Sequence, residues 1–183
     1  TENKGIAENT NAAFAMAKGE FVGLLDHDDL LAPNALYEVV NALNQHEHGD
    51  AVYTDEDKVT AELDEHFQPH LKPDFNIDLL RSNNYICHFF VVRRQLVEEV
   101  GGFRREFDGA QDYDFIFRCT EAAKEIYHIP RVVWKKPGKW CMYRRFCTIG
   151  VPTRHLLLII LQVRCTLLKQ ANALSRHILK GLE

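Results

Sequence analysis

Residues 21–29 read FVGLLDHDD, a short apolar run that passes directly into three aspartates. A continuous apolar run of this length is typical of a strand buried on both faces of an α/β sheet. In such sheets ligands bind beyond the carboxyl ends of the strands. The segment therefore predicts both the class of fold and the edge of the sheet where a functional site lies.

Helix and strand patterns alternate on either side of this segment. Helices are expected at 7–18, from Pro33 to about 43, at 95–100 and at 112–123; strands are expected at 51–54, 85–92 and 126–133. Residues 59–78 have an irregular pattern broken by two prolines. The alternation predicts an α/β protein with a largely parallel sheet flanked by helices.

Charge divides the chain of 183 residues into two unlike parts. Residues 1–134 hold 12 Lys+Arg and 25 Asp+Glu, a balance of 12 − 25 = −13, and residues 135–183 hold 10 and 1, a balance of +9. Such a break predicts a boundary near Trp134. The five cysteines are odd in number and form no CxxC pair, which favours a reducing, cytoplasmic compartment.

The aspartates at 26, 28 and 29 are the strongest local signal of chemistry. Three carboxylates within four residues repel one another unless a cation lies between them, and oxygen ligands suit Mg²⁺ or Mn²⁺. The alternative is a solvated acidic turn that caps the following helix. The sequence is compatible with both interpretations, a metal site and a capping turn.

A second signal is GAQDYD at 109–114, at the start of a predicted helix. A helix N-terminus favours the ionised form of Asp112, the form that a general base needs, although a plain capping acid has the same pattern. Asp55 and Asp57 either line the same cleft or end a strand in solvent. His88, the one polar ring in an apolar run, is either a core histidine or an acceptor contact.

Six blocks in this order resemble the family 2 glycosyltransferases of bacteria, above all those that build O-antigen and rhamnan-like surface polysaccharides. The blocks are AKGEF at 17–21, LDHDD at 25–29, YTDEDK at 53–58, LKPDF at 71–75, GGF at 101–103 and GAQDYD at 109–114. The resemblance implies a GT-A fold, a mixed sheet flanked by helices. It also implies that Asp28 binds Mn²⁺ or Mg²⁺ and that Asp26 and Asp29 lie on the donor side.

The same resemblance implies that Asp112 is the catalytic base, with Gln111 where the family more often has glutamate. From the patterns of the residues themselves we expect Asp55, Asp57 and His88, together with Gln111, to line the cleft or the acceptor side. The implied reaction moves a sugar from a nucleotide-diphosphate donor to a saccharide or lipid-linked acceptor, with inversion. We expect it in the cytoplasm or at the inner face of the cell membrane. The basic tail suggests peripheral membrane contact, and the acidic body opposes a nucleic-acid partner.

Two departures from the family pattern qualify this expectation. The nucleotide-binding strands that open the family would precede Thr1, and 135–140 reads KKPGKW where the family has Trp-Arg-x-His. We therefore expect a partial GT-A domain at 1–134 and an atypical basic tail at 135–183. An inactive truncated remnant is the alternative function.

The basic tail has two interpretations. The first is that 135–183 is translated out of frame, because permissible codons read in another frame resemble the C-terminal helix of the family. The second is a genuine amphipathic segment that lies on anionic lipid or binds a partner. Reading the coding DNA in all three frames tests the first, because stop codons in the other frames would exclude it.

Overall fold

The computed structural model describes residues 4–26, 29–60, 63 and 65–137. Within these residues the strands form one six-stranded sheet in the order β1-β5-β3-β6-β2, with β4 paired to β3. The strands are β1 (Phe21–Leu24), β2 (Leu30–Leu31), β3 (Ala51–Val59), β4 (His66–His70), β5 (Phe90–Arg93) and β6 (Ile126–Pro137). The helices are α1 (Ile6–Phe14), α2 (Ala35–Gln45), α3 (Ile77–Ser82), α4 (Arg94–Val100), the 3₁₀ turn η1 (Arg105–Phe107) and α5 (Gln111–Ala122).

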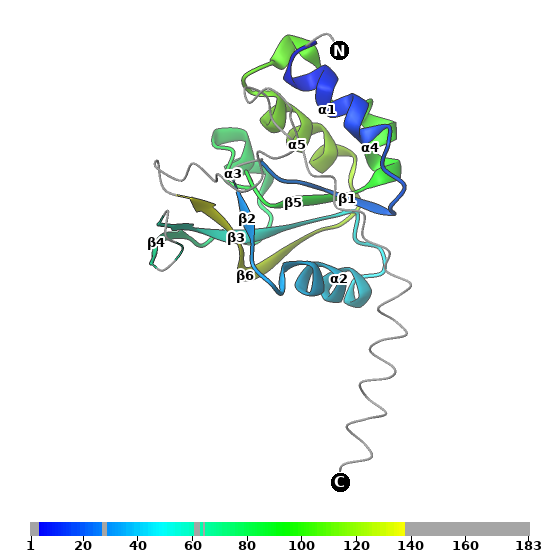
Figure 1. Cartoon of the computed structure of the whole chain (residues 1–183). Helices are drawn as coiled ribbons and strands as arrows, with labels where there is room; N and C mark the ends of the chain where they lie inside the picture. The colour runs from blue at the N-terminus through cyan, green and yellow to red at the C-terminus, as the bar shows by residue number, and fades with distance from the viewer. Residues whose placement is uncertain (1–3, 27–28, 61–62, 64, 138–183) are drawn as a thin grey trace.

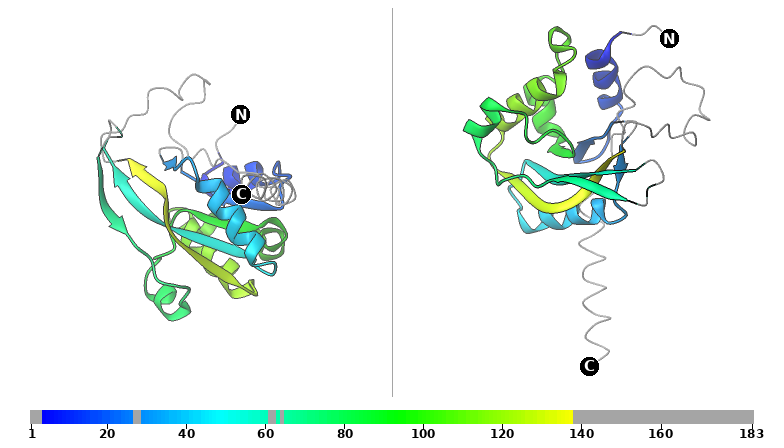
Figure 2. Two further views of the ribbon diagram at one scale, coloured as in Figure 1. Left: turned by 90° about the horizontal axis from the view of Figure 1, so that it is seen from below. Right: turned by 90° about the vertical axis from the view of Figure 1, so that its left-hand side faces the viewer.

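Helices cover both faces of the sheet. Figure 1 shows α2 on one face and α1, α4 and α5 on the other, and Figure 2 shows the same layers from two further sides. Side chains alternate along β1: Val22 and Leu24 join the core beneath α4 and α5, and Phe21 joins the core against α2. The prediction of a strand buried on both faces at 21–25 is confirmed, with the strand ending at Leu24.

The prediction of a largely parallel sheet is wrong. β3 and β6 pair in parallel, whereas every other pairing of described strands is antiparallel. The chain returns from β3 through β4 and the six-residue α3, without a long helix crossing the sheet, and β5 then inserts antiparallel between β1 and β3. Parallel pairing needs a crossover that packs on the sheet, which this segment lacks in its described residues.

Several boundaries also differ from expectation. The first helix ends at Phe14 rather than near Lys18, and β4 and α3 occupy the stretch expected to be irregular. β3 continues to Val59, because β6 and β4 pair along its outer half, so residues 55–57 lie inside the strand rather than after it. Residues 85–89 precede β5 instead of belonging to it.

The predicted helix from about residue 112 is confirmed as α5, and its Phe115, Ile116 and Cys119 are buried as expected. α4 ends at Gly101, whose φ of 81° is the left-handed conformation that glycine adopts without strain at a helix end. Asp112 lies in the first turn of α5, and residues 101–110 connect it to α4.

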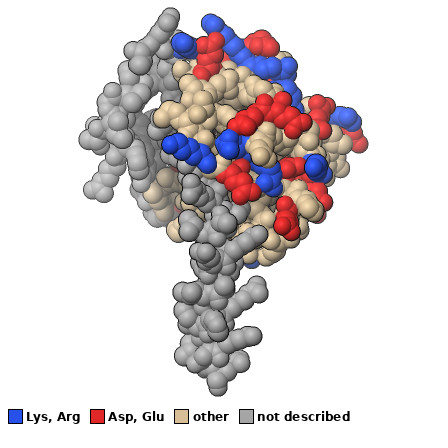
Figure 3. All heavy atoms as spheres, turned by 90° about the vertical axis from the view of Figure 1, so that its right-hand side faces the viewer, with Lys and Arg blue, Asp and Glu red and all other residues tan. Residues whose placement is uncertain are grey.

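The sheet continues past the charge boundary at Trp134. β6 pairs with β3 as far as Pro137, and β2 pairs with β6 through Leu31↔Trp134 and Leu30↔Lys135. The predictions for the rest of the basic tail, 138–183, lie outside the described residues, and the described part holds no helix long and apolar enough to span a bilayer. On the face in Figure 3, acidic and basic side chains are interleaved over the described surface.

Candidate functional site

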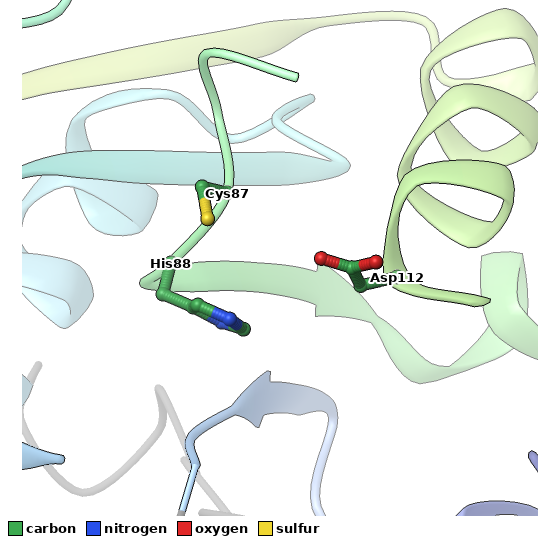
Figure 4. A group of neighbouring side chains, drawn as sticks. All are labelled: Cys87, His88 and Asp112. Atoms are coloured by element: carbon green, nitrogen blue, oxygen red, sulfur yellow. The ribbon is translucent and has the colours of Figure 1, made fainter. Parts of the chain in front are cut away.

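The start of α5 and the segment before β5 bring three functional side chains together. Candidate ligand atoms of Cys87, His88 and Asp112 all lie within 4.8 Å of one another. Figure 4 shows Asp112 on the first turn of α5, with its carboxylate facing the side of the chain that carries Cys87 and His88. Two residues that the sequence singled out, His88 and Asp112, are therefore neighbours although 24 positions separate them in the sequence.

Asn84 connects the two walls of this site. Its Nδ2 donates to Asp112 Oδ2 at 3.4 Å, and its Oδ1 accepts a hydrogen bond from the backbone N–H of Cys87 at 3.2 Å. One amide side chain thus fixes the distance between the α5 N-terminus and the 84–88 segment.

The carboxyl end of β1 reaches the same place. Asp26 Oδ2 lies 3.6 Å from His88 Nε2, and the side chain of His88 is 11% exposed. The backbone N–H of Asp29 donates to the Asp26 carbonyl at 3.1 Å, and Asp29 is buried. Asp28, the expected metal ligand, lies outside the described residues.

A buried lysine holds the 86–88 segment in place. Lys72 Nζ donates to the carbonyls of Ile86 and His88 at 2.8 and 2.5 Å and lies 3.0 Å from Glu56 Oε2, and its side chain is fully buried. Burial lowers the pKa of Lys72, while Glu56 opposes this shift. The lysine binds the backbone on both sides of Cys87 and so fixes the direction in which Cys87 and His88 project.

The acids of β3 have structural contacts. Asp55 Oδ1 accepts from the backbone N–H of Lys72 at 2.9 Å and lies 2.8 Å from His128 Nε2, so it joins three segments inside the core. Asp57 Oδ2 lies 2.7 Å from Nδ1 of His66 on β4. These contacts place both acids along β3, whereas Asp26, His88 and Asp112 share the neighbourhood described above.

Two residues beside Asp112 hold the local structure. The side-chain Oε1 of Gln111 accepts from the backbone N–H of Gly109 at 2.7 Å, across the start of the helix. Asp114 binds Arg104 and Arg118, and Arg118 in turn donates to the carbonyls of Val100 and Gly102 at 2.7 Å. Burial opposes ionisation of Asp114, but the two arginines outweigh it and keep its pKa below the usual value.

Sequence analysis missed Asn84, Cys87 and the role of Lys72. Lys72 belongs to the LKPDF block, but nothing local distinguishes a buried lysine from a solvated one. Cys87 has φ 43°, a left-handed conformation that non-glycine residues seldom adopt, and it interrupts the strand pattern of 85–92. The asparagine pair at 83–84 is a turn signal that could have marked this break.

Comparison with known proteins places the chain in a family. The family model "Glycosyl transferase family 2" matches residues 1–101. An uncharacterised protein of Sinorhizobium fredii is 45% identical over 134 residues, which is 72% of this chain and 15% of the relative. The O-antigen biosynthesis protein RfbC of Myxococcus xanthus is 46% identical over 123 residues, which is 67% of this chain and 10% of the relative.

The fold matches a solved structure as well. The crystal structure of S. aureus TarS 1-349 in complex with UDP-GlcNAc has a TM-score of 0.58 and 19% identity, covering 75% of this chain and 40% of that one. The chain thus spans a minor part of the proteins that it resembles. The expected GT-A arrangement, a mixed sheet flanked by helices, is confirmed. The chain belongs to glycosyl transferase family 2.

Proposed function

We propose that this chain carries the catalytic part of a metal-dependent, inverting glycosyltransferase that moves a sugar from a nucleotide-diphosphate donor to a saccharide or lipid-linked acceptor in cell-surface polysaccharide biosynthesis. The observation that carries the proposal is the convergence of Asp26, His88 and Asp112 at one end of the sheet. Family membership, the O-antigen biosynthesis relative and the solved complex with UDP-GlcNAc support the class of reaction and donor.

Asp112 is the residue that we assign as base. The acceptor hydroxyl oxygen forms a bond to the anomeric carbon while its proton passes to the Asp112 carboxylate, and the bond from that carbon to the diphosphate oxygen breaks. A single displacement from the face opposite the leaving group inverts the anomeric centre. Asn84 keeps the carboxylate aimed at the space beside His88, which fits a group that must meet an incoming hydroxyl.

The end of β1 suits a hard divalent cation. Asp26 is partly exposed at the end of a buried strand, Asp29 follows it, and both offer only carboxylate oxygens, the ligands that Mg²⁺ and Mn²⁺ prefer. Asp26 and Asp28 would hold the ion. A bound ion would supply positive charge against the negative charge that develops on the departing diphosphate. His88 Nε2 lies 3.6 Å from Asp26 Oδ2 and links the end of β1 to the neighbourhood of Asp112.

Release of nucleoside diphosphate from nucleotide sugars tests the proposal. We expect the purified full chain to release it with Mn²⁺ or Mg²⁺ present, to stop when EDTA removes the ion and to resume when the ion is restored. Product linkage, determined by NMR, should have the opposite anomeric configuration to the donor. A retained configuration would contradict the inverting step. No release from any of a panel of uridine, guanosine and thymidine diphospho-sugars would favour the alternative, an inactive remnant.

The charge of the tail supports a second role, peripheral contact with anionic lipid at the inner face of the membrane. Residues 135–183 carry +9, whereas the rest of the chain carries −13. We expect the chain to sediment with phosphatidylglycerol vesicles at low salt but not with phosphatidylcholine vesicles. Replacing Arg164, Lys169 and Arg176 by glutamine should weaken binding, and salt should weaken it further. Equal binding to both vesicle types would refute the electrostatic contact.

A further inference from the structure

We propose that Cys87, His88 and Asp112 form a binding site for a zinc-class cation, separate in chemistry from the oxygen-ligand site at the end of β1. The three side chains offer a thiol sulfur, an imidazole nitrogen and a carboxylate oxygen, all within 4.8 Å of one another. Among the described residues, these three side chains form a group that could hold a metal ion, and Cys87 gives this group a sulfur ligand. Figure 4 shows Asp112 on α5 and Cys87 and His88 on the segment before β5, around one region.

The ligand set selects for the metal. Zn²⁺ binds thiolate sulfur at about 2.3 Å, imidazole nitrogen at about 2.0–2.1 Å and carboxylate oxygen at about 2.0–2.2 Å, usually with tetrahedral geometry. Two such ligands on one tetrahedral ion are about 3.3–3.6 Å apart. The observed limit of 4.8 Å exceeds this spacing by about 1.2–1.5 Å, so a contraction of at most that size would bring the three side chains onto one ion. Mg²⁺ and Mn²⁺ prefer oxygen and are disfavoured by the sulfur.

The surroundings already hold the ligands close to these positions. Asn84 ties the backbone of Cys87 to the carboxylate of Asp112, and Lys72 binds the carbonyls on both sides of Cys87. Polar groups that fix the ligands in this way raise the metal affinity of a site. The left-handed conformation of Cys87 is kept by the same contacts, and residues in such conformations cluster at ligand-binding sites.

Occupation of this site would oppose catalysis. A cation on Asp112 withdraws the carboxylate from proton transfer, so Zn²⁺ should inhibit the reaction that Mn²⁺ or Mg²⁺ supports. This consequence rests on the proposed function, whereas the binding itself does not. Three protein ligands leave a fourth position, at which an acceptor hydroxyl or a water molecule could bind in place of a fourth side chain.

Cobalt substitution tests the binding directly. The full chain with Co²⁺ alone should show the visible bands of a tetrahedral ion and a thiolate-to-cobalt charge-transfer band, and Zn²⁺ should displace both. Cys87→Ser should abolish the charge-transfer band, and His88→Gln and Asp112→Asn should each weaken binding at least tenfold. His70→Gln is the matched control, because His70 is exposed on β4 and its ring lies beside Glu56; it should leave the spectrum unchanged.

Two further measurements keep the test decisive. Asn84→Ala removes no ligand and should still lower the affinity for Co²⁺. Circular dichroism shows whether this variant is folded, so that a loss of affinity is not mistaken for unfolding. Cys119 should not contribute, because burial raises the pKa of its thiol to about 12. A charge-transfer band that survives Cys87→Ser in a chain whose Cys141, Cys147 and Cys165 are also replaced by serine, or an affinity unchanged in Asp112→Asn, would overturn the site. Co²⁺ binding without any sugar transfer would leave the site intact and count against the proposed function alone.

Discussion

Replacing Asp112 by asparagine is expected to lower the rate of sugar transfer by about 10²–10⁴-fold, the usual contribution of a general base. Asparagine keeps the shape of the side chain, and its oxygen can still accept from Asn84, but it cannot take the proton of the acceptor hydroxyl. Steady-state kinetics should show the loss in kcat with little change in the KM for the donor. A variant with the parental kcat would remove Asp112 from the mechanism.

Asp114 provides the matched control for this prediction, because it lies on the same helical turn and has the same chemistry. It binds Arg104 and Arg118 instead of facing His88. Asp114→Asn should lower the free energy of unfolding by about 1.5–3 kcal/mol, toward the lower value because Arg104 is 42% exposed. Its activity per folded molecule should remain near that of the parent. The two variants thus separate loss of chemistry from loss of structure.

Lys72→Met is expected to give the largest loss of stability. The substitution keeps the length of the side chain but leaves the Glu56 carboxylate and the carbonyls of Ile86 and His88 without their cation. Removing one partner of a buried ion pair costs about 3–5 kcal/mol of unfolding free energy. Urea denaturation followed by circular dichroism measures the change. Because the lysine also fixes the 86–88 segment, cobalt binding and sugar transfer should fall in the folded fraction too.

Two comparisons decide whether the effect comes from this pair. Lys58→Met removes an exposed lysine that binds Gln68 on the same hairpin, and it should change stability by less than about 0.5 kcal/mol. In the double variant with Glu56→Gln the loss should be smaller than the sum of the single losses, because the uncompensated carboxylate is gone. Strictly additive losses would show that Lys72 and Glu56 act independently.

Local patterns predicted the elements that present the site. The apolar run at 21–25 and the helical spacing of Phe115, Ile116 and Cys119 are properties of short segments, and both elements form where they were expected. Asp26 and Asp112 lie at the ends of these elements, so the sequence could place them on strand and helix termini. Asp26 and Asp112 are close to each other because both lie near His88, which precedes β5. The sequence pattern did not predict the antiparallel pairing of β5 with β1 that places His88 there.

The remaining features depend on neighbours that are distant in the sequence. Asp55 and Asp112 look alike as acids at the end of predicted elements, yet Asp55 lies in the core because His128 and the backbone of Lys72 meet it there. Lys72 is buried because carbonyls of another segment surround its ammonium group. No property of the flanking residues encodes such contacts, so sequence analysis could list the charged groups but not assign their partners.

The parallel pairing at the middle of the sheet has a consequence for synthesis of the chain. Ala51 on β3 pairs with Ile126 on β6, a separation of 126 − 51 = 75 residues, and the pairing continues to Val59 and Pro137. Pairing between such distant segments forms slowly, because closing a long loop costs chain entropy before any contact between the strands offsets that cost. The ribosome must therefore have extruded residues 126–137 before the pairing along β3 is complete. Until then one edge of β3 is unpaired and can pair with other chains, which makes the nascent protein prone to aggregation at that stage.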